Sequence, residues 1–125
     1  MEKEILILIV EDEKVNCELL EILLTRKKLP YLLAYTGMDA LDLFKKHPEI
    51  DLVLLDIKLP DISGEDVLKE MKALRPEIPI LVQTAYVFDT DRAHFYELGC
   101  DDYIKKPIFK DVFYEKVSHW LKREI

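Results

Sequence analysis

The sequence has little of what marks basic, disulfide-stapled or secreted proteins. Its 18 lysines and arginines are outnumbered by 25 aspartates and glutamates, which gives a net charge of −7 at pH 7. This balance argues against the basic footprint of a nucleic-acid-binding domain and against docking on anionic lipid, so we expect no direct contact with nucleic acid or membrane. The two cysteines, Cys17 and Cys100, form no CxxC pair, and we expect both to be reduced and buried.

Long apolar runs and flexible linkers are absent too. The first apolar run, Ile5–Val10, is too short to cross a bilayer, and it lacks the basic flank and cleavage site of a signal peptide. There is no Gly/Ser-rich or Pro-rich linker and no low-complexity tract. The 125 residues therefore suit one cytoplasmic domain that builds its core without disulfides.

Five short apolar runs are present, and amphipathic stretches separate them. A continuously apolar run such as Leu52–Leu55 is typical of a strand that is buried on both faces of a sheet. Strand alternating with helix five times predicts an α/β fold, in which helices cover both faces of a parallel sheet. The predicted strands are Ile5–Val10, Tyr31–Tyr35, Asp51–Leu55, Ile78–Thr84 and Asp102–Ile104.

The stretches between these runs carry apolar stripes at helical spacing. The stretch Asp89–Leu98 has the least regular stripe, so we expect its helix to be the least tightly held. The residues of the other helices that are expected to face the core are Val15, Leu19, Ile22 and Leu23; Ala40, Leu41 and Phe44; Val67, Leu68, Met71 and Leu74; and Phe109, Val112, Phe113, Val117, Trp120 and Leu121.

Polar residues gather where the predicted strands end. Glu11 and Asp12 follow the first strand, and Asp56 follows the third. Thr84 closes the fourth strand, and Lys106 follows the fifth. Because ligands of an open parallel sheet bind at the carboxyl ends of its strands, we expect these side chains to share one rim.

Each of these residues also has an ordinary structural interpretation. Glu11 or Asp12 could cap the following helix, and Asp56 could accept hydrogen bonds from turn amides. Thr84 could be a plain strand residue, and Lys106 a solvated surface lysine. Their joint placement at the same ends of alternating elements favours one shared chemical site.

The carboxylates of this rim suggest a particular chemistry. Carboxylates packed closely repel one another, and a hard divalent cation such as Mg²⁺ or Mn²⁺ relieves the repulsion through oxygen ligands. A carboxylate can also accept a phosphoryl group as an acyl phosphate, while a lysine pairs with phosphoryl oxygens. The cluster therefore predicts metal-assisted phosphoryl transfer, in which positioning and charge neutralisation do most of the catalysis.

Four segments, in their order and spacing, resemble the receiver domain of two-component response regulators over essentially the whole chain. They are ILIVEDE, LVLLDIKLPDISG, ILVQTAY and GCDDYIKKP. The combination of VEDE, Asn16 and TAY…GCDDYIKKPI is most similar to receivers of hybrid sensor histidine kinases. The resemblance implies a flavodoxin-like (βα)5 fold, which is a doubly wound parallel five-stranded sheet with strand order 2-1-3-4-5.

The resemblance also implies roles for individual residues. Asp56 would be the phosphoacceptor. Glu11, Asp12, Asp56 and the backbone carbonyl of Lys58 would hold Mg²⁺. Glu11 and Asp12 would hold the metal directly or through water. Because Glu11 is one methylene longer than the aspartate that is also common at its position, a contact through water is the alternative to direct binding there. The side chains of Lys58 and Tyr86 would tune the lifetime of the phosphoryl group.

Three residues would respond to phosphorylation. Thr84 would move toward the phosphoryl group, Lys106 would pair with it, and Tyr103 would turn inward as the aromatic switch. The Lys106–Pro107 peptide bond would be cis. These movements would bias the face formed by the fourth helix, the fifth strand and the fifth helix.

By the same resemblance the chain is a signalling switch and not an enzyme, with slow or no turnover of its own. Its phosphoryl donor would be a sensor histidine kinase or a histidine phosphotransfer domain, and the protein would be a monomer or weak dimer. Residues 1–125 would form a single receiver domain with no output domain. That domain would be free-standing or part of a larger protein, including one tethered to a membrane histidine kinase.

Two other functions fit this fold class but not these residues. A hydrolase of the haloacid-dehalogenase kind needs a second aspartate two residues after the nucleophile, where this chain has Lys58. A flavin- or nucleotide-binding module needs a Gly-rich or Ser/Thr-rich loop after the first strand, where this chain has the acidic segment Glu11–Glu13.

Overall fold

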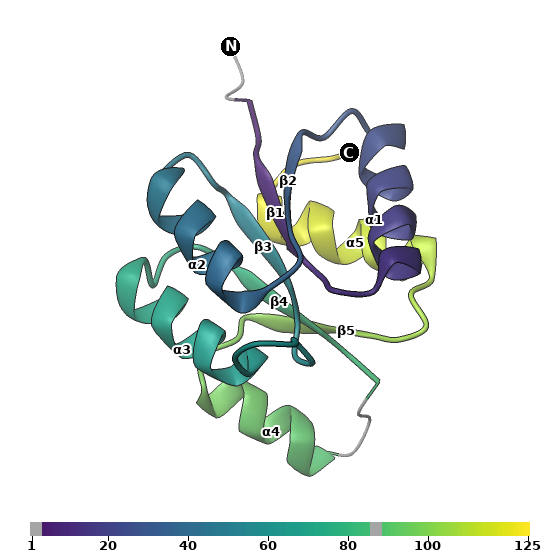
Figure 1. Cartoon of the computed structure of the whole chain (residues 1–125). Helices are drawn as coiled ribbons and strands as arrows, with labels where there is room; N and C mark the ends of the chain where they lie inside the picture. Colours follow the sequence, from purple (N-terminus) through teal and green to yellow (C-terminus); the bar gives the residue numbers. More distant parts are fainter. Residues whose placement is uncertain (1–3, 86–88) are drawn as a thin grey trace.

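The chain folds around a parallel sheet of five strands (Figure 1). The computed structural model describes residues 4–85 and 89–125. The strand order is β2-β1-β3-β4-β5, which confirms the predicted flavodoxin-like topology. The strands are β1 (Ile7–Val10), β2 (Tyr31–Ala34), β3 (Leu52–Asp56), β4 (Ile80–Thr84) and β5 (Asp102–Lys105).

Helices cover both faces of this sheet (Figure 1). Helices α1 and α5 pack on one face, whereas α2, α3 and α4 pack on the other. The helices are α1 (Lys14–Arg26), α2 (Gly37–Lys46), α3 (Gly64–Leu74), α4 (Asp89–Glu97) and α5 (Lys110–Leu121). Within the described residues, no helix has the length and apolar character needed to span a membrane.

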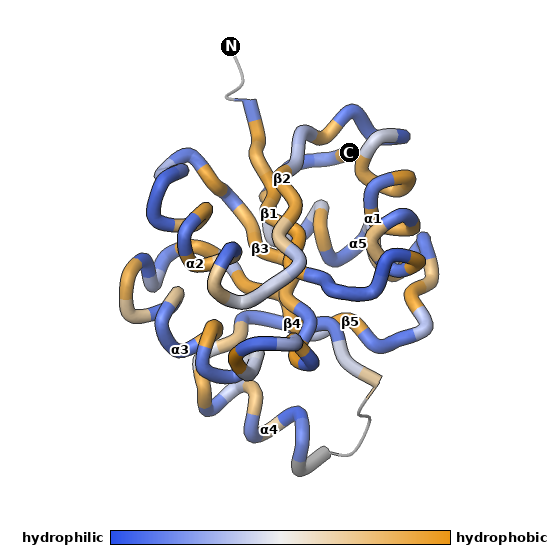
Figure 2. Tube along the Cα trace, in the orientation of Figure 1, coloured by the Kyte–Doolittle hydropathy of each residue, from blue (hydrophilic) through white to orange (hydrophobic). Residues whose placement is uncertain are grey.

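The side chains of each strand alternate between these two layers. In β1, Ile7 and Ile9 pack with α1 and α5, whereas Leu8 and Val10 pack with the other helices. Since both faces are covered, every residue of β1, β3 and β4 is buried, and the apolar strands form the centre of the molecule in Figure 2. This explains why Leu52–Leu55 is apolar without alternation.

The predicted stripe of α1 is wrong in two places. Val15 is 76% exposed and Ile22 is 50% exposed. The helix instead buries Cys17, Leu20 and Leu24. Residues two positions apart are separated by about 200° around a helix, so Val15 and Ile22 lie on the side opposite this buried stripe.

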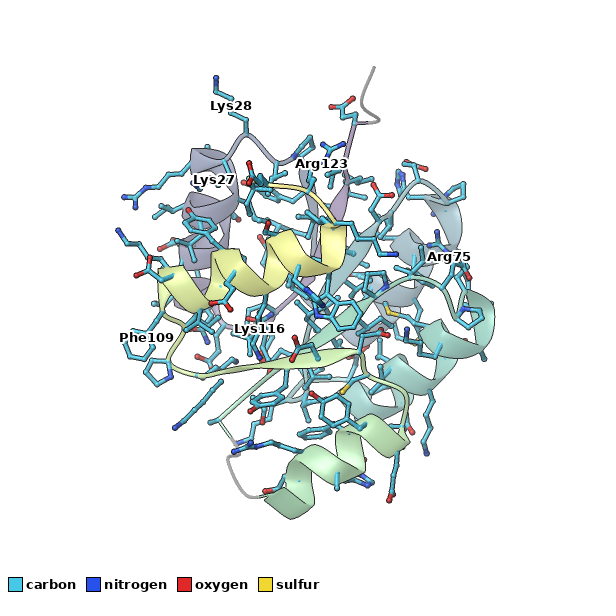
Figure 3. The ribbon with its side chains drawn as sticks, turned by 180° about the vertical axis from the view of Figure 1, so that it is seen from behind. Lys27, Lys28, Arg75, Phe109, Lys116 and Arg123 are labelled. Atoms are coloured by element: carbon cyan, nitrogen blue, oxygen red, sulfur yellow. The ribbon has the colours of Figure 1, made fainter. Side chains whose placement is uncertain are left out.

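Three residues of the other predicted stripes also face outward. Phe109 is 68% exposed, Leu74 is 46% exposed and Val112 is 45% exposed. Phe109 is the N-cap residue of α5 and lies at its very end, away from the sheet (Figure 3). The fully buried core residues of α5 are Phe113 and Val117, and the predicted Trp120 and Leu121 pack against the same core while partly exposed.

The least regular helix has little buried surface. Among the described side chains of α4, only Phe95 is buried, and its neighbour Tyr96 is 45% exposed. The stripes of α2 and of the first two turns of α3 are confirmed. Their buried residues are Ala40, Leu41, Phe44, Val67, Leu68 and Met71.

Both cysteines are buried and unpaired, as predicted. Burial raises the pKa of Cys17 to about 11 and that of Cys100 to about 12, so neither is a reactive thiolate at neutral pH. The Cys17 thiol donates a hydrogen bond to the carbonyl oxygen of Glu11 at 3.2 Å. This contact ties α1 to the end of β1.

Two glycines occupy the first position of α2 and α3, each after a capping residue. Thr36 accepts a hydrogen bond from the amide of Asp39, and Ser63 accepts one from Asp66. A Cβ at Gly64 would lie 2.5 Å from the Cα of Ile57, whereas at Gly37 the nearest atoms belong to side chains. The Gly64 amide also donates to the carbonyl of Ile57 at 3.0 Å. The backbone of the loop that follows β3 therefore leaves no room for a side chain at Gly64.

Gly64→Ala is expected to lower the free energy of unfolding by about 1–3 kcal/mol, because the clashing backbone cannot rotate away. Gly37→Ala is the matched control, since its Cβ meets the movable side chains of Ile62 and Val67. Urea unfolding of the two variants measures the difference. Equal losses from both substitutions would contradict the backbone clash.

Candidate functional site

The polar residues at four strand ends converge on one cleft, as predicted from their order. Asp56 is the last residue of β3 and Thr84 the last of β4, while Glu11 and Lys106 directly follow β1 and β5. Asp56, Thr84 and Lys106 line a cleft of about 400 Å³. The amide of Lys106 donates to the carbonyl of Thr84 at 2.8 Å, which continues the β4–β5 pairing into the site.

Three carboxylates crowd together around Asp56, which lines this cleft. Oxygen atoms of Glu11, Asp12 and Asp56 all lie within 4.8 Å of one another. Glu11 is completely buried and Asp56 is only 3% exposed, whereas Asp12 is exposed. Burial, followed by the neighbouring Asp56 carboxylate, raises the pKa of Glu11 to about 7. The site therefore holds more negative charge than it can stabilise, and Glu11 retains a proton at pH values where carboxylates are normally ionised.

Lys106 is the cation that partly balances these carboxylates. Its ammonium nitrogen lies 3.2 Å from Glu11 Oε1 and 3.4 Å from Asp56 Oδ1. Burial by itself would lower the pKa of Lys106, but attraction to Asp56 and Glu11 outweighs it and the pKa is raised. Lys106 is thus charged and half-buried, not the solvated surface lysine of the ordinary interpretation.

Backbone amides bind the carboxylates as well. The amide of Lys58 donates to Asp56 Oδ1 at 3.1 Å, and the amide of Glu13 donates to Glu11 Oε2 at 3.3 Å. Asp56 therefore does stabilise its own turn, as its ordinary interpretation held. Helix α1, in contrast, has Glu13 as N-cap without a side-chain hydrogen bond, so neither Glu11 nor Asp12 is its cap.

Thr84 and Pro107 complete the cleft on the β4–β5 side. Thr84 is 3% exposed, and Pro107 lines the cleft beside Lys106. The Lys106–Pro107 peptide bond is cis. Lys58 also lines the cleft, and it is exposed.

Tyr103 lies outside this cluster, between α4 and α5. The guanidinium carbon of Arg92 is 5.0 Å from the centre of its ring, and the ammonium of Lys116 is 4.3 Å from it. Lys116, which extends from α5 (Figure 3), also donates to the carbonyl of Tyr103 and, at 3.0 Å, to Asp102. The ring of Tyr96 packs nearly perpendicular to the Tyr103 ring, with 6.5 Å between the ring centres. Tyr86, the other residue expected to act here, lies outside the described residues.

One residue of the cleft was missed by the sequence analysis. Gln83 lines the cleft and is completely buried, directly opposite Asp56 in the β3–β4 register. The signal in the sequence was one amide side chain, Gln83, between the apolar residues Ile80–Val82 and Thr84. A single glutamine does not stand out within a predicted strand.

The donor set fits a divalent metal ion. Three carboxylates with oxygens within 4.8 Å of one another are hard ligands, and a cation would offset both the burial and the repulsion that raise the pKa of Glu11. When bound there, Mg²⁺ or Mn²⁺ supplies charge neutralisation for phosphoryl oxygens.

Comparisons with known proteins place this site in a family. Residues 7–118 match the model of the response regulator receiver domain. The polar-differentiation response regulator DivK of Brucella ovis is 36% identical over 118 residues, which cover 92% of this chain and 94% of DivK.

Solved structures agree with the sequence match. A CheY-like receiver domain protein from Methanospirillum hungatei JF-1 superposes with a TM-score of 0.87 at 28% identity, covering 96% of this chain and 95% of that one. A two-component response regulator from Clostridium difficile has a TM-score of 0.88 at 30% identity, with 95% and 97% covered. The chain therefore belongs to the response regulator receiver domain family, and it acts as a phosphoacceptor in two-component signalling.

Proposed function

We propose that Asp56 is the residue that accepts the phosphoryl group, from a phosphohistidine on a sensor histidine kinase or a histidine phosphotransfer domain. The observation that carries this proposal is the position of Asp56. It ends the central strand β3, opens into the cleft, and has a lysine ammonium 3.4 Å away. Glu11 is completely buried and Asp12 lies toward solvent, so neither combines cleft access with this placement.

The transfer is a displacement at phosphorus. An oxygen of the Asp56 carboxylate attacks the phosphorus of the phosphohistidine, the P–N bond breaks, and an acyl phosphate forms as the imidazole leaves. Lys106 neutralises charge on the phosphoryl oxygens from the β5 side of the cleft. The reaction then depends on positioning and charge more than on a proton-transfer residue. This agrees with Lys58 standing two residues after Asp56, where a hydrolase would have an aspartate as general acid.

Asp56→Asn is expected to abolish phosphorylation by a small acyl phosphate such as acetyl phosphate, because an amide oxygen is a poor nucleophile. Asp66→Asn, the same chemical change at an exposed position of α3, is the control and should be phosphorylated at the wild-type rate. Intact-mass spectrometry measures the added phosphoryl group. Wild-type labelling of the Asp56 variant would refute the assignment.

We further propose that Glu11, Asp12, Asp56 and the carbonyl of Lys58 hold Mg²⁺ or Mn²⁺. The three carboxylates support this through their mutual distances, and Lys58 through its position two residues beyond Asp56. Glu11 already binds Lys106 and a backbone amide, so its contact with the metal is expected to run through water.

Asp12→Asn is expected to weaken Mg²⁺ binding by about tenfold or more, because it removes a carboxylate charge from the ligand set. Asp12 is the informative position since it is exposed and its replacement leaves the buried Lys106–Glu11 pair intact. Isothermal titration with Mg²⁺ measures the affinity, with Asp66→Asn again as the control. An unchanged affinity would remove Asp12 from the metal site.

Phosphorylation is proposed to act through Thr84 and Tyr103 on the face formed by α4, β5 and α5. Thr84 ends β4 at the cleft, and Val82 of the same strand pairs with Tyr103. Because α4 buries little, a small movement at the cleft has the least resistance there. The Lys58 side chain and Tyr86 are proposed to tune how long the acyl phosphate persists, and its loss by hydrolysis is proposed to be slow.

Beryllofluoride, which mimics a phosphoryl group on aspartate, is expected to shift the backbone amide signals of α4 and β5 more than those of α2. The reason is that α4 buries only Phe95 among its described side chains, whereas α2 buries Ala40, Leu41 and Phe44. Two-dimensional NMR of labelled protein with Mg²⁺ present makes the comparison. Equal shifts in α2 and α4 would contradict the proposed face.

The wider setting of the domain stays a prediction. We propose that residues 1–125 act as one receiver domain in the cytoplasm, as a monomer or weak dimer. The similarity to receivers of hybrid sensor histidine kinases also stays a prediction. A hydrolysis assay with a generic phosphomonoester distinguishes this switch from a hydrolase, since only a hydrolase would release phosphate from the ester repeatedly.

A further inference from the structure

Gln83 is a buried amide in the proposed phosphoacceptor cleft that none of the roles above explains. It is completely buried, and it lines the same cleft as Asp56 and Lys106. Among the residues that the structure describes, neither its amide nitrogen nor its amide oxygen has a hydrogen-bond partner. A buried amide without partners destabilises a fold, and an apolar residue would serve this strand better. Its presence therefore points to a role other than packing.

Strand geometry places Gln83 on the face of the sheet that carries the chemistry. Its neighbour Leu81, two residues earlier, packs with α1 and α5, and so does its β5 partner Ile104. Side chains alternate along a strand, so Gln83 shares this face with Asp56, its β3 partner, and with Lys106, two residues beyond Ile104. Gln83 thus lies between the strand that carries the acceptor and the strand that leads to the lysine.

The amide of Gln83 carries both an acceptor and a donor, which suit Lys106 and Asp56 respectively. Its oxygen can accept a hydrogen bond from the Lys106 ammonium, and its NH₂ group can donate to an oxygen of Asp56. It is also neutral, so it adds nothing to the charge of a site that already crowds three carboxylates.

In this structure the Lys106 ammonium already has two carboxylate partners, Glu11 at 3.2 Å and Asp56 at 3.4 Å. A divalent cation on the carboxylates competes for those same oxygens. A phosphoryl group on Asp56 would offer the ammonium phosphoryl oxygens in place of Glu11. The N–H that now bonds Glu11 at 3.2 Å would become available to another acceptor, since an ammonium has three donors.

We propose that Gln83 is a positioning residue of the phosphoacceptor site, whose amide holds the Lys106 ammonium and an Asp56 oxygen once metal and phosphoryl group occupy the cleft. This inference rests on the proposed function of Asp56. It assigns Gln83 no bond-making step. The amide restricts the positions that the Lys106 ammonium can take. This raises the fraction of molecules in which Lys106 is placed to pair with the phosphoryl oxygens.

NMR offers a direct readout, because the chain contains one glutamine and one asparagine, Gln83 and Asn16. Only two side-chain NH₂ signal pairs are therefore present, and the pair that disappears in Gln83→Met belongs to Gln83. Addition of Mg²⁺ and beryllofluoride to the wild-type protein is expected to move the Gln83 pair by more than its linewidth. A Gln83 pair that stays in place while backbone amides of the cleft shift would overturn the proposal.

Kinetics of Gln83→Met give an independent test, since methionine keeps the length of the side chain and removes both polar atoms. The rate of phosphorylation by acetyl phosphate at saturating Mg²⁺ is expected to fall about tenfold, as for the loss of one charge-assisted hydrogen bond. The Mg²⁺ affinity should be unchanged, and the urea midpoint should be unchanged or higher because an unpaired buried amide is gone.

The outcomes separate this inference from the function on which it rests. A wild-type rate in Gln83→Met, with Asp56→Asn inert, would overturn the role of Gln83 and leave Asp56 as the acceptor. A slower rate accompanied by a lower urea midpoint would also overturn it, since Gln83 would then act through stability. Labelling of Asp56→Asn at the wild-type rate would remove the proposed function itself.

Discussion

The contact between Lys106 and two buried carboxylates is the constraint on which the rest of the site depends. Glu11 and Asp56 lie at neighbouring strand ends, where the parallel sheet forces them together, and both are almost fully buried. One ammonium cannot balance two buried carboxylates and a third nearby. The imbalance appears in the raised pKa of Glu11, about 7. A site with this surplus of negative charge binds a proton, a divalent cation or the charge rearrangement of phosphoryl transfer more readily than an ordinary acidic surface.

The alternation of side chains along the strands divides the site into two layers. Glu11, Asp56 and Gln83 have the parity of the residues that pack with α1 and α5. Thr84 and Tyr103 have the opposite parity, which directs them toward α2, α3 and α4. The proposed acceptor and the proposed responding residues therefore belong to opposite faces of the sheet, and Thr84 meets Asp56 only at the cleft beyond the strand ends. The strand ends join the two layers, since the backbone amide of Lys106 donates to the carbonyl of Thr84 at 2.8 Å.

Much of this arrangement could be predicted from the sequence, because a parallel sheet converts order along the chain into position in space. The strand order and the convergence of Asp56, Thr84 and Lys106 follow from that rule. Outward-facing residues were harder, since Val15 and Phe109 are as apolar as the core and only the packed helix reveals their side. The protonation of Glu11 depends on distances, which no spacing pattern contains.

Gln83 shows why a functional residue can hide in a strand. The same position filled by an apolar side chain would preserve the sheet register and the core, so a pattern of buried residues gives no reason to notice it. What distinguishes it is the conflict between complete burial and two unpaired polar atoms, which appears only when burial and hydrogen bonds of the described residues are known. A lysine or glutamate there would shift the charge balance of Glu11, Asp56 and Lys106. A neutral amide leaves that balance intact and still offers both a donor and an acceptor, which is the property that a site about to exchange one set of charges for another requires.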